Sequence, residues 1–212
     1  MDLALFPLNA VLFPGGMLGL RVFEPRYMDM VRDCMRHQRP FGVCMIARGS
    51  EVGDPAQPEA VGCIATIEAW DMRQLGLLHI RALGQERFRI RRSHAGADRL
   101  LRGEVEAIAP DPDSPIAPEH QACADLLGRI IDDHERQQKA KPAAGTGDEP
   151  PAMDVVRFAQ PHQMQSSVWV GNRLCEVLSI PLRAKQKLME LEDAYMRLEI
   201  VQNFLKQHSV IG

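Results

Sequence analysis

The chain has 212 residues, of which 45% are hydrophobic and 25% are charged, and its net charge at pH 7 is −3. A chain of this length and composition can bury one large hydrophobic core or two small ones. Its small net charge excludes binding of nucleic acid or of an anionic membrane over the whole protein surface. No apolar run approaches the roughly 18 residues of a membrane span, and the N-terminal residues lack a signal-peptide pattern, so the sequence predicts a cytoplasmic protein without a membrane partner.

Short apolar runs separated by glycine and proline turns predict a small β-barrel in the first half of the chain. The expected strands are residues 3–6, 17–23, 41–47, 60–70, 75–83, 86–92 and 103–109.

One segment of the first half, residues 25–38, predicts a helix packed against this barrel. Pro25 suits the first position of a helix. Apolar residues gather on one arc of the helical wheel, and charged residues lie opposite. The apolar arc holds Tyr27, Met28, Val31, Cys34 and Met35, and the outer arc holds Arg26, Asp29, Asp33 and Arg36, with Met30 among them at a position expected to be exposed.

Four prolines between residues 110 and 118 mark a boundary, because proline at this density supports neither a helix nor a central strand. The sequence therefore predicts a barrel over residues 1–109, a proline-rich connection over residues 110–118 and a helical bundle over residues 119–212. Within the bundle, residues 139–152 hold few apolar side chains and are expected to form a mobile loop.

After the boundary, apolar residues recur with helical spacing. One stripe runs from Cys123 to His134, and Val170 and Leu174 mark a further helix. A last helix is expected to run from Pro181 to about residue 207, with apolar residues on two faces. The second face consists of Met189, Met196, Ile200 and Phe204. It either lies inside the bundle or forms a partner or self-association surface, for which the adaptable side chain of methionine is suited.

Residues 6–27, with the sequence FPLNAVLFPGGMLGLRVFEPRY, resemble the opening of the Lon protease N-terminal substrate-binding domain. The resemblance continues through FGVCMIARGSEVG, AVGCIATIEAWDM and LLHIRALGQERFRI, where Gly84 is expected to form a turn, and into RLCEVL and KQKLMELEDAYMRL of the helical half. It implies an α+β fold in which a PUA-like β pseudobarrel with one packed helix is followed by an α-helical bundle.

The resemblance also implies a non-enzymatic module that binds exposed polypeptide segments or a protein partner, as an adaptor or in quality control. A stand-alone member of this family is expected, because the chain contains no GxxxxGK[ST] motif for an ATPase and no peptidase motif.

The residues themselves offer no readable catalytic or metal-binding constellation. His134 and Glu135 are not followed by the second histidine of an HExxH motif, and Cys34 lies on the buried arc of its helix, away from the solvent that a catalytic thiol needs. The five cysteines are scattered without a CxxC pair, so we expect them to be reduced and mostly buried. No catalytic residue, no cofactor and no metal ion is expected.

The outer arc of the first helix is the candidate surface for polypeptide binding. Arg26, Asp29, Met30, Asp33 and Arg36 combine mixed charges with one apolar side chain, which suits an unfolded segment bound through shallow apolar contacts and a polar rim. The alternative is an ordinary solvated helix face.

A second candidate surface would bind RNA or a small anion. Arg87, Arg89 and Arg91 alternate along an expected strand and therefore share one face, where a ladder of guanidinium groups suits phosphate. The alternative is an exposed barrel face on which they pair with acids such as Glu104 and Glu106. The aromatic content of 5% disfavours stacking on RNA bases.

Overall fold

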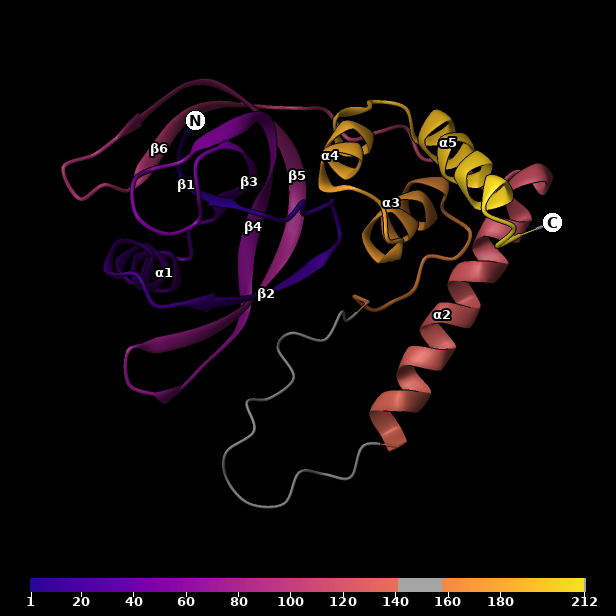
Figure 1. The fold of residues 1–212 in the computed structure, drawn as a ribbon, viewed down its shortest axis with the longest axis horizontal. Coiled ribbons are helices and arrows are strands. Elements are labelled where there is room, and N and C mark those ends of the chain that lie inside the picture. The colour runs from indigo at the N-terminus through magenta and orange to yellow at the C-terminus, as the bar shows by residue number, and fades with distance from the viewer. Residues whose placement is uncertain (141–157, 212) are drawn as a thin grey trace.

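The computed structural model describes residues 1–140 and 158–211, with the strands in the first part of the chain and most helices in the second. The elements are β1 (Asp2–Leu8), β2 (Met17–Val22), α1 (Pro25–His37), β3 (Phe41–Arg48), β4 (Gln57–Gln74), β5 (Leu77–Ala95), β6 (Leu101–Ala107), the short 3-10 helix η1 (Pro118–His120), α2 (Gln121–Ala140), α3 (Ser167–Val177), α4 (Leu182–Glu190) and α5 (Ala194–Gln207). The strands and α1 lie at one side of the molecule and α2–α5 at the other (Figure 1). No helix in the described residues is long and apolar enough to cross a membrane.

Five of the strands form a closed ring. Strands β5, β4, β3, β1 and β6 are hydrogen-bonded in this order, and β6 pairs again with β5. Only β1 and β3 run parallel to each other; the other neighbouring strands in the described residues are antiparallel. β2 pairs with β5 alone and lies at an edge. The expected α+β class is confirmed, whereas the PUA-like pseudobarrel stays a prediction.

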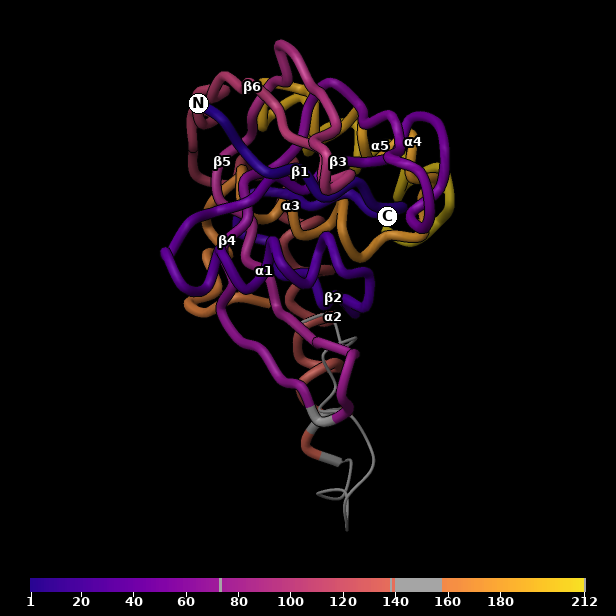
Figure 2. The backbone as a smooth tube through the Cα atoms, turned by 90° about the vertical axis from the view of Figure 1, so that its left-hand side faces the viewer, coloured from indigo at the N-terminus to yellow at the C-terminus, as the bar shows by residue number. Residues whose placement is uncertain are grey.

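The long β4–β5 hairpin replaces two expected strands with one. Residues 77–83 and 86–92 belong to the continuous strand β5, while residues 75 and 76 lie in the turn before it, and the turn expected at Gly84 is therefore wrong. Gly84 lies where the loop before β2 crosses the sheet: its N–H donates to the carbonyl oxygen of Gly16, and its carbonyl oxygen accepts from the N–H of Gly15, both at 2.8 Å. A Cβ here would clash with the carbonyl oxygen of Phe13, so the close backbone contact requires glycine. The tip of this hairpin projects from the body of the molecule (Figure 2).

Helix α1 begins at Pro25 and buries the predicted apolar arc. Tyr27, Val31 and Cys34 are buried, and the ring of Tyr27 stacks on the ring of Phe6 in β1 with centroids 4.1 Å apart. The helix ends where Gln38 adopts a left-handed conformation. All five cysteines are free and buried, as expected.

The helical half packs directly on the strands. One apolar core joins Phe13, Val61 and Ile108 of the first half to Leu127 of α2 and Leu174 of α3. Burial of apolar surface at this contact stabilises the arrangement of the two halves, at roughly 25 cal/mol per Å² removed from water. The division into separate domains at residues 109 and 118 stays a prediction.

The expected loop over residues 139–152 is only partly within the described structure. Helix α2 continues to Ala140, so residues 139 and 140 are helical and not part of a loop. Residues 141–152 lie outside the described residues.

The expected last helix, from Pro181 to about residue 207, is broken into α4 and α5. The carboxylate of Asp193 caps α5 by accepting a hydrogen bond from the N–H of Met196 at 3.0 Å. The carbonyl oxygens at the end of α4 accept hydrogen bonds from two arginines: Leu188 from Arg197 at 2.8 Å, and Met189 from Arg87 at 3.0 Å. The break supplies buried guanidinium groups with acceptors that a continuous helix would use internally.

Both guanidinium groups share one buried carboxylate. Asp111 forms ion pairs with Arg87 of β5 and with Arg197 of α5, the latter at 2.7 Å, and the three side chains are at most 4% exposed. Arg87 also donates to the carbonyl oxygen of Leu191 at 2.8 Å. The cluster therefore ties strand β5, the proline-rich connection and the α4–α5 junction together.

Replacing Asp111 is expected to destabilise the fold strongly. Asp111→Asn leaves two buried guanidinium groups without their counter-charge, and we expect the free energy of unfolding to fall by about 3 kcal/mol or more. Urea denaturation measures this loss. The matched control is Glu106→Gln, which removes the exposed partner of Arg91 and is expected to cost less than about 1 kcal/mol. Equal losses in the two variants would contradict the role of the cluster.

A second buried pair lies where α3 meets the loop before β2. The Arg173 guanidinium contacts the Glu176 carboxylate at 2.7 Å and donates to the carbonyl oxygen of Pro14 at 2.9 Å. Burial raises the pKa of Glu176 to about 7, and the charges of Arg173 and Lys185 partly oppose this shift.

The raised pKa of Glu176 predicts a pH-dependent stability. Between the ordinary pKa of 4.5 and about 7, the folded state holds a proton that the unfolded state has lost, so the stabilisation due to this proton declines as pH rises across this window. We compare the free energy of unfolding of the wild type with that of Glu176→Gln. The difference, wild type minus variant, is expected to fall by up to about 3 kcal/mol from pH 4.5 to 7.5. Denaturation at a series of pH values measures it, and a flat difference would contradict the prediction.

Candidate functional site

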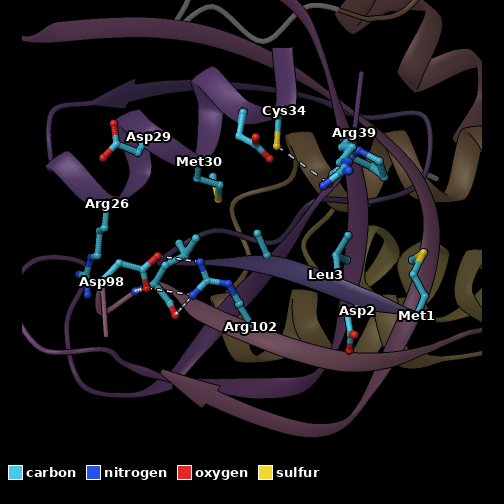
Figure 3. A pocket seen from close by; sticks show the side chains of 14 residues that line it. Met1, Asp2, Leu3, Arg26, Asp29, Met30, Cys34, Arg39, Asp98 and Arg102 are labelled. Carbon is cyan, nitrogen blue, oxygen red and sulfur yellow. Dashed lines mark hydrogen bonds and ion pairs between the residues drawn. The ribbon is translucent and has the colours of Figure 1, made fainter. Parts of the chain in front are cut away.

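A cavity of about 680 Å³ lies between α1, the first residues of β1 and the turn that joins β5 to β6 (Figure 3). We call it the α1 groove. Four residues predicted for polypeptide binding line it, namely Arg26, Asp29, Met30 and Asp33. Arg36 is exposed on the same helix, and the groove does not extend to it. The structure therefore brings most of the predicted set to one cavity.

The floor of the α1 groove is apolar. Leu3 of β1, Met30 of α1 and Leu100 line it and are buried. The expected exposure of Met30 is wrong, because this side chain is only 4% exposed and points from the helix toward the strands (Figure 3). A helical wheel describes one buried face, but here the strands and the β5–β6 turn cover two sides of α1.

Arg26 joins the helix to the β5–β6 turn. Its guanidinium lies 4.6 Å from the centroid of the Tyr27 ring, pairs with Glu24 at 3.0 Å and donates to the carbonyl oxygen of Arg99 at 3.2 Å. The side chain is buried, and its Nε has no hydrogen-bond partner among the described residues. A buried donor without a partner is costly, so an acceptor that entered the groove would gain from reaching it.

The rim of the groove carries charges that the sequence did not indicate. Asp98 and Arg102 pair at 2.6 Å across the β5–β6 turn, and the hydrogen bonds from Arg102 hold the pKa of Asp98 well below its usual range. Arg39 lines the groove beyond the end of α1. These residues come from turns that lie far from α1 in sequence, so no local pattern reveals them.

The acidic residues of α1 stand at the exposed side of the groove. Asp29 pairs with Arg32 at 2.8 Å and Asp33 with His37 at 3.3 Å, both within the helix. Cys34 forms part of the wall, and burial raises the pKa of its thiol to about 11, so it stays protonated at neutral pH. The groove thus has an apolar floor, a rim of mixed charge and an unreactive thiol, which suits binding.

The arginine ladder is only partly on the surface. Arg87 is buried in the cluster with Asp111, so its expected place on an exposed anion-binding face is wrong. Arg89 pairs with Glu192 at 3.3 Å, and Arg91 forms a hydrogen bond to Glu106 at 2.6 Å. Arg87 faces inward because the helical half covers this end of β5. Anion or RNA binding at Arg89 and Arg91 stays a prediction.

The expected partner surface of the last helix is also divided. Met189 lies in the separate helix α4 and is only 2% exposed, so its place on that surface is wrong. Met196 and Ile200 of α5 are each 45% exposed. Phe204 is partly buried, and its ring lies 4.2 Å from the ring of His208. The role of the exposed pair in partner binding stays a prediction.

In residues 1–140 and 158–211, no three histidine, cysteine, aspartate or glutamate side chains gather closely enough to hold a metal ion.

The family model of the ATP-dependent protease La (LON) substrate-binding domain matches residues 2–207. The chain belongs to this family. A crystal structure of a Lon N-terminal domain protein from Xanthomonas campestris is similar in sequence and fold: identity is 34%, the TM-score is 0.73, and 96% of this chain and 98% of that chain are covered. The N-terminal domain of a Mycobacterium avium complex Lon protease shares the fold, with 14% identity, a TM-score of 0.60, and coverage of 98% of this chain and 100% of that chain.

A more distant relative is the protein cereblon of Danio rerio. It is 29% identical over 109 residues, which are 48% of this chain and 25% of cereblon. The chain therefore spans about a quarter of the length of this curated relative.

The burial of Met30 predicts a loss of stability on truncation. Met30→Ala removes a side chain from the floor of the groove and is expected to lower the free energy of unfolding by about 2–3 kcal/mol. Urea denaturation tests this against Met196→Ala, a truncation of an exposed methionine that is expected to cost less than about 0.5 kcal/mol. A negligible change in the free energy of unfolding of Met30→Ala would contradict the burial of this side chain.

Proposed function

We propose that this chain is a non-enzymatic recognition module that binds exposed polypeptide segments in the α1 groove and acts as an adaptor or in protein quality control. The observation that carries the proposal is the composition of the groove, in which an apolar floor lies beneath a rim of mixed charge. Such a site accepts many segments, because apolar contact needs no particular sequence and a rim of both signs repels neither acidic nor basic chains.

Backbone groups at one wall of the groove support a polypeptide ligand. β1 pairs with β6 from Asp2 onward, but its pairing with β3 begins only at Leu5. The stretch from Asp2 to Ala4 therefore has a partner strand on one side and the groove on the other. Together with the unpaired Nε of Arg26, this wall offers hydrogen bonds to a peptide backbone, which every polypeptide carries.

The family assignment also supports polypeptide binding. It is described as a substrate-binding domain, and the match covers nearly the whole chain. An unfolded segment loses conformational freedom when it binds, so the expected affinity for a single segment is weak, in the micromolar range at about 1–100 μM.

Filling the groove is expected to weaken binding of an unfolded protein. The probe is reduced, carboxymethylated α-lactalbumin, and the variant is Asp33→Trp, which places a large side chain at the mouth of the groove without removing a buried group. We expect its affinity for the probe, measured by fluorescence anisotropy, to fall by about tenfold or more, equivalent to about 1.4 kcal/mol.

The matched control is Arg36→Trp, which introduces the same side chain on the same helix outside the groove. Its affinity is expected to stay within about twofold of the wild type. Equal affinities of the two variants, or no binding of the probe by the wild type at high micromolar concentration, would contradict the proposal.

A further inference from the structure

Strand β2 has an open edge. It pairs with β5 from Met17 to Val22 and has no second partner strand among the described residues. Its six residues extend over about 20 Å at about 3.3 Å per residue. The strand contains no proline or lysine, which are residues that commonly protect an edge from further pairing.

The register shows which backbone groups this edge presents. The N–H of Gly84 donates to the carbonyl oxygen of Gly16 across the β2–β5 pair. Because hydrogen-bonded residues alternate in an antiparallel pair, Leu18 and Leu20 bond to β5, whereas Gly19 and Arg21 turn their N–H and C=O groups away from it. No hydrogen bond from the described residues reaches these outward groups.

The edge of β2 borders a groove of about 540 Å³. Four consecutive residues of β2, Leu18 to Arg21, line it together with Phe6 and Leu8 of β1 and the acidic Glu51. Phe23 stands at the groove with 54% of its surface exposed. We call this cavity the β2 groove; it differs from the α1 groove in every lining residue.

The shape of the β2 groove selects its occupant. Because residues of β1 line the same cavity as the edge of β2, the edge borders a groove and not a flat surface on which the sheet of another folded molecule can align. A single extended chain suits such a groove, and its backbone supplies the donors and acceptors that Gly19 and Arg21 lack. Arg21 is exposed and has no ion-pair partner in the described part of the chain, so it favours an acidic side chain directly beside it on the neighbouring strand. The carboxylate of Glu51 also lines the groove, so an acidic side chain is favoured beside Arg21 and not near Glu51.

We propose that the β2 groove binds an extended polypeptide segment of a partner, which adds to the sheet as a strand along β2. Alternate side chains of the segment are apolar and pack on Phe6, Leu8 and Leu18, and a side chain on its outer face is acidic and lies beside Arg21. The backbone hydrogen bonds provide affinity, and the alternation of the side chains provides specificity. The site is separate from the α1 groove and does not depend on the function proposed for that cavity.

Amide exchange tests the strand addition in the wild-type protein. The probe is a blocked nine-residue peptide in which valine alternates with threonine and glutamate. In the free protein, the amide proton of Leu20 is expected to exchange slowly and those of Gly19 and Arg21 quickly, as measured by NMR. Saturation with the peptide is expected to slow the exchange of Gly19 and Arg21 by about tenfold or more, because their N–H groups become bonded. The same peptide N-methylated at every residue is expected to have no effect.

A pair of variants tests the same contact by affinity. Gly19→Pro removes one outward N–H and leaves the bonds to β5 intact, and it is expected to weaken peptide binding by about tenfold or more. Gly19→Ala keeps the N–H and is expected to bind within about twofold of the wild type. Asp33→Trp, which fills the α1 groove, is also expected to leave this peptide's affinity unchanged.

Three outcomes would overturn the inference. One is peptide binding that leaves the Gly19 and Arg21 amides in fast exchange. Another is binding that Asp33→Trp abolishes and Gly19→Pro does not, which would place the peptide in the α1 groove and support the function proposed there. The third is concentration-dependent protection of the Gly19 amide without peptide, which would show that a second copy of the chain occupies the edge.

Discussion

The carboxylate of Asp111 lies between the guanidinium groups of Arg87 and Arg197, and the relation of the strands to the helices depends on this buried contact. Two cations and one anion in a dry interface are stable only if the remaining N–H groups find acceptors. The carbonyl oxygens of Leu188 and Met189 accept from one N–H group of each arginine, because α4 ends there, whereas Nη1 of Arg197 is buried without a hydrogen-bond partner in the described part of the chain. The broken last helix and the covered end of β5 therefore meet at this one buried cluster.

Incomplete strand pairing creates both candidate binding sites. β1 begins before its partner β3, which leaves residues 2–4 beside the α1 groove, and β2 attaches to β5 without a second neighbour, which leaves its edge beside the β2 groove. A fully paired barrel would satisfy these backbone groups internally. We propose a polypeptide as the occupant of both grooves because each combines apolar side chains with backbone groups that lack a partner strand, and an extended segment can match both.

Local sequence patterns predicted the helices and strands well, but they predicted less well which segments pack against them. Pro25 and the arc from Tyr27 to Cys34 predicted α1 correctly, because helix initiation and amphipathicity are properties of adjacent residues. The same pattern predicted Met30 to be exposed, but the strands bury it. The alternation along β5 predicted Arg87 to be exposed, but α4 and α5 pack over that end of the strand. Each error concerns a contact with residues far away in the chain.

The sequence by itself determined the α+β class, the order of a strand-rich half before a helical half, the buried cysteines and, through its motifs, the membership of the Lon substrate-binding domain family. These follow from local periodicity and from residues that stand next to one another. Only the tertiary structure decided that Gly84 lies within a continuous strand, that Arg87 is buried, and that Asp98 and Arg102 complete the rim beside α1. The reason is physical: burial and pairing are set by segments that meet in space, and no spacing along the chain records which segments those are.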